Sequence, residues 1–164
     1  MNKQKLKYLI QQVPELIETA EKCQEVGLPN FYIAGGAITQ IIWNSIDRKP
    51  LLAQVKDFDV VYFDRSNLVT EDEFKNRIGS RLSHSVDVDV KNQALIHERY
   101  SEKFGCSIQA YERVEQGIES WLSAFAIGFT IGSAGNIKLF TPYGLDDAFN
   151  MLIKPNRKAM TETN

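Results

Sequence analysis

The segment KDFDVVYF, residues 56–63, decides the fold expected for this chain. Its apolar residues continue for four positions after Asp59, which predicts a strand over 57–63 that runs into the core. Side chains at positions i and i+2 of a strand point to the same face, so Asp57 and Asp59 lie side by side. Ionised carboxylates are not buried without compensation, so we expect this pair at an open end of the strand.

A second acidic strand is predicted over 86–91, where valines alternate with charged residues. This period places Asp87, Asp89 and Lys91 on one face, and Asp87 and Asp89 compete for the role of a third acidic ligand. Carboxylate oxygens are the ligands that hard cations such as Mg²⁺ prefer. The acidic residues of the two strands therefore predict a metal site of the kind used in phosphoryl transfer. Lys91 is expected either to neutralise phosphate charge or to be an ordinary exposed lysine.

The pair Gly35-Gly36 separates a short apolar segment, 31–34, from a segment with helical spacing, 37–44. Glycines at such a junction let the backbone approach a phosphate while the first helical amides point at it. A glycine pair between two elements is most often only a tight turn. Followed by the acidic strands, however, this pair predicts a phosphate-binding turn.

The remaining segments alternate between helical and strand patterns. Residues 3–26 are predicted as an amphipathic helix, loosened at Pro14 and stopped by Gly27. Further helices are expected at 71–82, 92–104, 112–124 and 144–151, and a hairpin of strands at 126–131 and 136–140. Helices and strands alternate first and the hairpin comes late, which predicts an α/β (α+β) fold with a mixed sheet.

Length and composition indicate one globular domain over residues 1–164, with an N-terminal helix 3–26, a core 30–156 and a polar tail 157–164. A hydrophobic content of 43% and a charged content of 24% are ordinary for globular proteins. The net charge of −2, without a basic stripe, argues against nonspecific nucleic-acid binding. Neither a signal peptide nor an apolar run of membrane-spanning length is visible, so we expect a cytoplasmic protein without membrane contact.

Several residues that could bind ligands elsewhere are expected to be structural here. His97 lies on a predicted helix, and with only His84 elsewhere no histidine metal cluster can form. Trp43 and Trp121 occupy apolar helical positions and are predicted to be core residues. Cys23 and Cys106 lack C-x-x-C spacing, so a zinc site or a disulfide framework is not indicated.

Together these segments resemble the nucleotidyltransferase superfamily typified by DNA polymerase β, and more narrowly a small bacterial family of nucleotidyltransferase-like proteins. The matching stretches are residues 35–44, 56–64, 89–94 with His97, 142–147 and 154–156. The resemblance covers most of the chain from residue 30 to residue 156. It implies the polymerase-β-like fold, a mixed β-sheet flanked by helices. The insertion 45–54 departs from the superfamily pattern, because it separates the glycines from the acidic pair.

The resemblance also implies a reaction, the transfer of a nucleoside monophosphate from an NTP to a hydroxyl acceptor. Gly35, Gly36 and Lys91 would bind the nucleotide, while Asp57, Asp59 and Asp89 would be catalytic and hold Mg²⁺ or Mn²⁺. The acceptor stays open among a small molecule, a protein and an RNA. A catalytically inactive nucleotide-binding or antitoxin-like regulatory protein is the alternative. A haloacid-dehalogenase-like phosphatase is disfavoured, because its aspartates end an apolar strand, whereas these begin one.

Overall fold

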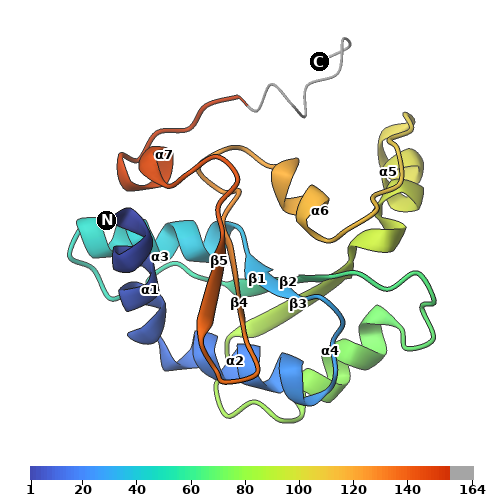
Figure 1. The fold of residues 1–164 in the computed structure, drawn as a ribbon, viewed down its shortest axis with the longest axis horizontal. Helices are drawn as coiled ribbons and strands as arrows, with labels where there is room; N and C mark the ends of the chain where they lie inside the picture. The colour runs from blue at the N-terminus through green and yellow to red at the C-terminus, as the bar shows by residue number, and fades with distance from the viewer. Residues whose placement is uncertain (156–164) are drawn as a thin grey trace.

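The computed structural model describes residues 1–155 and builds them around one mixed sheet (Figure 1). The N-terminal half contains the helices α1 (Asn2–Gln11), α2 (Pro14–Glu25), α3 (Gly36–Ile46) and α4 (Glu71–Gly79), and the strands β1 (Tyr32–Ala34), β2 (Asp57–Tyr62) and β3 (Asp87–Asn92). The C-terminal half contains the 3₁₀ turn η1 (Gln93–Leu95), the helices α5 (Ile96–Phe104), α6 (Glu115–Glu119) and α7 (Asp146–Phe149), and the strands β4 (Gly128–Ile131) and β5 (Ile137–Phe140).

The five strands of the described chain lie in the order β3-β2-β1-β4-β5. Strands β2 and β3 are parallel, and every other neighbouring pair is antiparallel. Parallel neighbours need a long crossover, which α4 provides between β2 and β3. The predicted mixed sheet with flanking helices is therefore confirmed.

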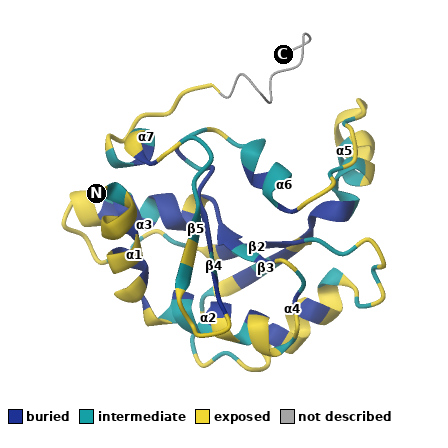
Figure 2. Ribbon diagram, in the orientation of Figure 1, coloured by how far each residue is buried: buried dark blue, intermediate teal, exposed yellow. Residues whose placement is uncertain are grey.

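One face of the sheet carries the main hydrophobic core, which α1, α2, α3 and α4 cover. Phe58, Val60 and Tyr62 point to this face from β2 and are fully buried. Ile38 and Ile42 of α3 belong to the same core. Burying a Val, Ile or Phe side chain in this way stabilises the fold by about 1.5–3 kcal/mol. Figure 2 shows these buried segments in dark blue at the centre of the molecule.

The other face of the sheet carries a smaller apolar cluster under α6. Ala34, Val61 and Ile118 are buried there, and Trp121 and Tyr143 pack against them. In Figure 1, α5 and α6 lie on the opposite side of the sheet from α2 and α4. Because α6 has only five residues, it leaves the acidic parts of β2 and β3 uncovered. The position of the site follows from this incomplete cover.

The predicted helix over 3–26 is two helices in the structure. Helix α1 ends at Gln11, and Pro14 is the first residue of α2. Proline has no N–H to donate within a helix, but it is well tolerated at the first helical position. The chain therefore breaks immediately before Pro14 instead of loosening there.

The predicted helix over 112–124 is shortened to α6, residues 115–119. The Gln116 side chain accepts hydrogen bonds from the backbone N–H groups of Glu112 and Arg113. These amides are satisfied without helical geometry, so the helix begins after them. The segment predicted as helix 92–104 begins with η1 before α5. The insertion 45–54 prolongs α3 to Ile46 and then forms turns.

Two expectations concern the ends of the chain and the membrane. The predicted polar tail, 157–164, lies outside the described residues. Among residues 1–155, no helix has the length and apolar character needed to cross a membrane.

Candidate functional site

Four aspartates stand in two pairs on the parallel strands β2 and β3. Asp57 is the register partner of Asp87, and Asp59 is the partner of Asp89. All four share one face, because each strand contributes positions two residues apart. Asp57 and Asp87 are exposed at the strand starts, whereas Asp59 and Asp89 are half-buried. The sequence-predicted residues Asp57, Asp59 and Asp89 therefore lie on one surface.

Asp59 has the most perturbed acidity of these carboxyl groups. Burial, followed by the negative charges of Asp57 and Asp89, raises the pKa of Asp59 to about 6, and Lys91 opposes this shift. The charge of Asp87 is not among these causes, so Asp89 is the electrostatic partner from β3. Asp89 is therefore the aspartate of β3 that acts on Asp59, and its choice over Asp87 as the third metal ligand stays a prediction.

Gly35 brings the backbone close to this carboxylate. It precedes α3 with a φ of 85°, and its N–H donates to the carbonyl of Ile127 at 2.9 Å. A Cβ atom on Gly35 would lie 3.5 Å from Asp59 Oδ2 and 3.3 Å from Trp121 Cζ3. A positive φ and a tight approach both favour glycine here. Gly36 is exposed, and a Cβ atom there would meet no atom within 4 Å.

Lys91 lies on the same face of β3, two residues after Asp89. Its Nζ is 3.6 Å from Asp89 Oδ1, and about half of its side chain is exposed. An exposed ion pair of this kind contributes at most about 1 kcal/mol of stability. The ammonium group can therefore leave Asp89 for a phosphate at little energetic cost.

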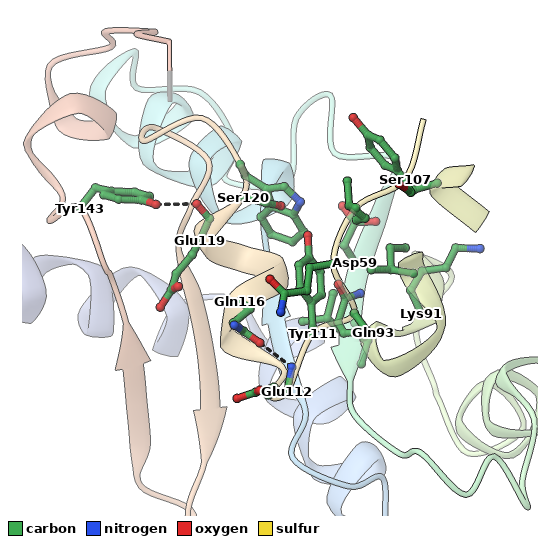
Figure 3. A pocket seen from close by; sticks show the side chains of 18 residues that line it. Asp59, Lys91, Gln93, Ser107, Tyr111, Glu112, Gln116, Glu119, Ser120 and Tyr143 are labelled. Carbon is green, nitrogen blue, oxygen red and sulfur yellow. Dashed lines mark hydrogen bonds between the residues drawn. The ribbon is translucent and has the colours of Figure 1, made fainter. Parts of the chain in front are cut away.

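A cavity of about 1240 Å³ opens beside these residues (Figure 3). Asp59, Val61 and Lys91 line it from the sheet. The other walls come from η1 and α5, from the segment 107–112, and from the end of α6. The volume exceeds the roughly 300–1,000 Å³ that is usual for small-molecule sites, so a ligand of nucleotide size has room in it.

Sequence reasoning missed several residues that line this cavity, among them Gln93, Tyr111, Trp121 and Tyr143. Trp121 was expected in the core, and it does pack against the cluster under α6, but it also faces the cavity. The hydroxyl of Tyr143 donates to the carbonyl of Glu119, which ties the segment after β5 to α6. Tyr143 was within reach of prediction, because it lies in the matching stretch 142–147. Trp43, which was predicted to be in the core, is half-buried and packs against the main core, with its indole N–H bonded to the carbonyl of Ala148 at 2.9 Å.

Among residues 1–155, no group of three or more His, Cys, Asp or Glu side chains is close enough together to hold a metal ion as the side chains stand. The donor chemistry nevertheless fits a hard divalent cation, since Asp57, Asp59 and Asp89 offer only carboxylate oxygens. Burial is the largest cause of the raised pKa of Asp59, and the repulsion from Asp57 and Asp89 that adds to it is the interaction that a bound cation relieves. The metal ligands remain a prediction.

Comparisons with known proteins identify the family and the fold of this chain. A family model described as Nucleotidyltransferase matches residues 21–164. A solved NMR structure described as a CCA-adding enzyme head domain is 20% identical, with a TM-score of 0.77 over 94% of this chain and 78% of that chain. A search of curated proteins returned no match. The structural likeness confirms the predicted nucleotidyltransferase fold, and the family match over most of its length shows that the chain belongs to the nucleotidyltransferase family.

Proposed function

We propose that this protein uses Mg²⁺ to transfer a nucleoside monophosphate from a nucleoside triphosphate to a hydroxyl acceptor. Family membership supports nucleotidyl transfer in general. The observation that carries the specific proposal is the position of Asp59. Its carboxylate lies beside Gly35 at the wall of the cavity, and the negative charges of Asp57 and Asp89 add to the burial that raises its pKa.

In this proposal Asp57, Asp59 and Asp89 hold the ion. Mg²⁺, or Mn²⁺ in its place, supplies positive charge that neutralises the phosphates and lowers the pKa of a bound hydroxyl. The half-buried position of Asp59 strengthens its interaction with a cation, because water screens a buried charge less than an exposed one.

The triphosphate is assigned to the start of α3, where helical amides lack partners within the helix. The Gly35 N–H is already bonded to Ile127, and the amides of Ile38 and Thr39 donate to the Gly35 carbonyl. The amides of Gly36 and Ala37 are therefore the ones we assign to phosphate oxygens. Lys91 is assigned to the same phosphates.

The chemical step joins the acceptor oxygen to the α-phosphorus of the triphosphate. The bond from this phosphorus to the β-phosphate oxygen breaks, and pyrophosphate leaves with the electron pair. The proton of the acceptor hydroxyl passes to the carboxylate of Asp89, which acts as the general base. The acceptor remains one of three classes, namely a small molecule, a protein or an RNA.

Isothermal titration calorimetry tests the binding half of this proposal. ATP, GTP, CTP and UTP are titrated with Mg²⁺ into the wild type, into Asp57→Ala/Asp59→Ala, and into Asp87→Ala as the control for an exposed carboxylate on the same face. We expect Mg²⁺-dependent binding that the double variant loses and the control keeps. No binding by the wild type, or binding that the double variant retains, contradicts the proposed site.

Pyrophosphate release tests the catalytic half. The wild type is incubated with its preferred NTP and Mg²⁺, and with polyols, a protein mixture or short RNA oligonucleotides as acceptors. Release that depends on one acceptor class supports transfer and identifies that class. Mg²⁺-dependent NTP binding without release under any acceptor would support the regulatory alternative instead.

A further inference from the structure

Gln93 is a buried polar residue in the wall of the cavity. Only 4% of its surface is exposed, although it lines a cavity of about 1240 Å³ (Figure 3). It is the first residue after β3, and the turn that holds it is fixed by Asn92, whose side chain accepts the N–H of Ala94. Its position in the wall is therefore set by the end of a central part of the sheet.

The carboxamide of Gln93 rests on α6 at a residue without a side chain. A Cβ atom on Gly117 would lie 2.1 Å from Gln93 Oε1. Any other residue at position 117 would therefore push the carboxamide away. This contact holds the end of the Gln93 side chain against one wall of the cavity.

Within residues 1–155, no side chain or backbone group is hydrogen-bonded to the Gln93 carboxamide in this structure. A carboxamide has two N–H donors and an oxygen that accepts two hydrogen bonds. The enclosed side-chain atoms without a partner among the described residues are those of Tyr62, Asn67 and His97, so the unbonded carboxamide atoms of Gln93 still reach solvent. Because the cavity is the space next to this carboxamide, a group bound in the cavity is the partner that it fits.

We propose that the Gln93 carboxamide pairs with the base edge of the bound nucleotide and selects adenine. This inference rests on the proposed function, because it takes an NTP as the cavity's ligand. Glutamine pairs with adenine through two parallel hydrogen bonds, one donated to N7 and one accepted from the N6 amino group. Ile96, Tyr100 and Tyr111 also line the cavity and provide apolar surface for the faces of a base.

The placement of Gln93 relative to the acidic residues suits this role. Gln93 follows Asp89 by four positions, which corresponds to about 13 Å along a strand. A nucleoside triphosphate places its phosphates and its base at opposite ends of an extended molecule. Phosphates near Asp59 and a base near Gln93 can therefore be bound at the same time.

Calorimetric titration of Gln93→Leu and Gln93→Glu tests this inference. The ligands are the four NTPs and inorganic tripolyphosphate, each with Mg²⁺. Gln4→Leu is the control, because Gln4 is an exposed glutamine on α1 that is not among the residues lining the cavity. We expect the wild type and the control to prefer ATP. Gln93→Leu should weaken ATP binding by about 10- to 100-fold, the loss of one bidentate base contact, and leave tripolyphosphate binding unchanged. Gln93→Glu keeps the side-chain volume but loses the donor to N7, so it should also lose the preference for ATP.

The two ligand types separate failure of this inference from failure of the proposed function. If ATP binding and its preference over the other NTPs survive in both Gln93 variants, the assignment of Gln93 is wrong while the proposed site stands. A wild-type preference for another nucleotide overturns the assignment to adenine. If neither NTPs nor tripolyphosphate bind to the wild type, the proposed function fails, and this inference fails with it.

Discussion

Replacing Asp59 by asparagine should stabilise the protein at neutral pH while removing its proposed function. The folded protein places the Asp59 carboxyl in a half-buried position near the charges of Asp57 and Asp89, and its pKa is raised to about 6. The folded state therefore binds this proton more tightly than the unfolded chain does. Ionisation of Asp59 opposes folding increasingly as the pH rises above 3.8, and the whole effect is reached above about pH 6.

The magnitude follows from the change in acidity. A rise from 3.8 to about 6, at about 1.4 kcal/mol for each pH unit, corresponds to about 3 kcal/mol. Solvent screens the charge of a partly exposed carboxylate, so we expect about 1–2 kcal/mol. Asparagine keeps nearly the same volume and carries no charge. The unfolding free energy of Asp59→Asn should therefore exceed that of the wild type by this amount at pH 7.5.

Urea denaturation at low ionic strength measures this difference. At pH 5 the advantage of Asp59→Asn should fall to about half of its value at pH 7.5. Asp87→Asn is the matched control, because Asp87 is exposed on the same face and is not among the charges that act on Asp59. This control substitution should change the unfolding free energy by less than about 0.5 kcal/mol. A variant no more stable than the wild type at pH 7.5, or an advantage that does not depend on pH, would refute this reasoning.

Two further predictions concern the glycine turn and the cysteines. Gly35→Ala should lower the unfolding free energy by about 1–3 kcal/mol, because its φ is 85° and its Cβ would press on Trp121. Gly36→Ala, at an open helical position, should raise the unfolding free energy by about 0.5 kcal/mol. Equal effects of the two substitutions in urea denaturation would contradict the role of the turn. Cys106 is exposed, whereas burial raises the pKa of Cys23 to about 12. A disulfide reagent at pH 8 should therefore modify Cys106 rapidly and Cys23 only when the protein unfolds. Two rapid modifications of the native protein would contradict the buried position of Cys23.

The sheet was predictable where each strand carries its own local pattern. Strands β2 and β3 were expected at 57–63 and 86–91 and are found at Asp57–Tyr62 and Asp87–Asn92. Their shared acidic face follows from the two-residue period of strands, so Asp57, Asp59 and Asp89 could be grouped from sequence. The break between α1 and α2 was only partly anticipated, because Pro14 was treated as a defect within a helix instead of the first residue of a new one.

Apart from Tyr143, the cavity walls were hard to predict, because no local pattern defines them. Gln93 faces the cavity because the strand ends there and because Gly117, distant in sequence, leaves room for its carboxamide. Trp121 has the helical spacing of a core residue, and only the early end of α6 turns it toward Gly35. Both positions depend on contacts between segments that are far apart in the chain, which a periodic pattern does not record.

The separation of the main core from the cavity has a consequence for the evolution of this protein. The core lies between one face of the sheet and helices α1 to α4, whereas the segment 107–112 forms a cavity wall and contributes no residue to either apolar cluster. Ser107, Gln109 and Ala110 within it are exposed. Surface segments of this kind accept substitutions, insertions and deletions with little effect on folding. Changes in this segment can therefore reshape the cavity while the fold and the acidic strands stay the same.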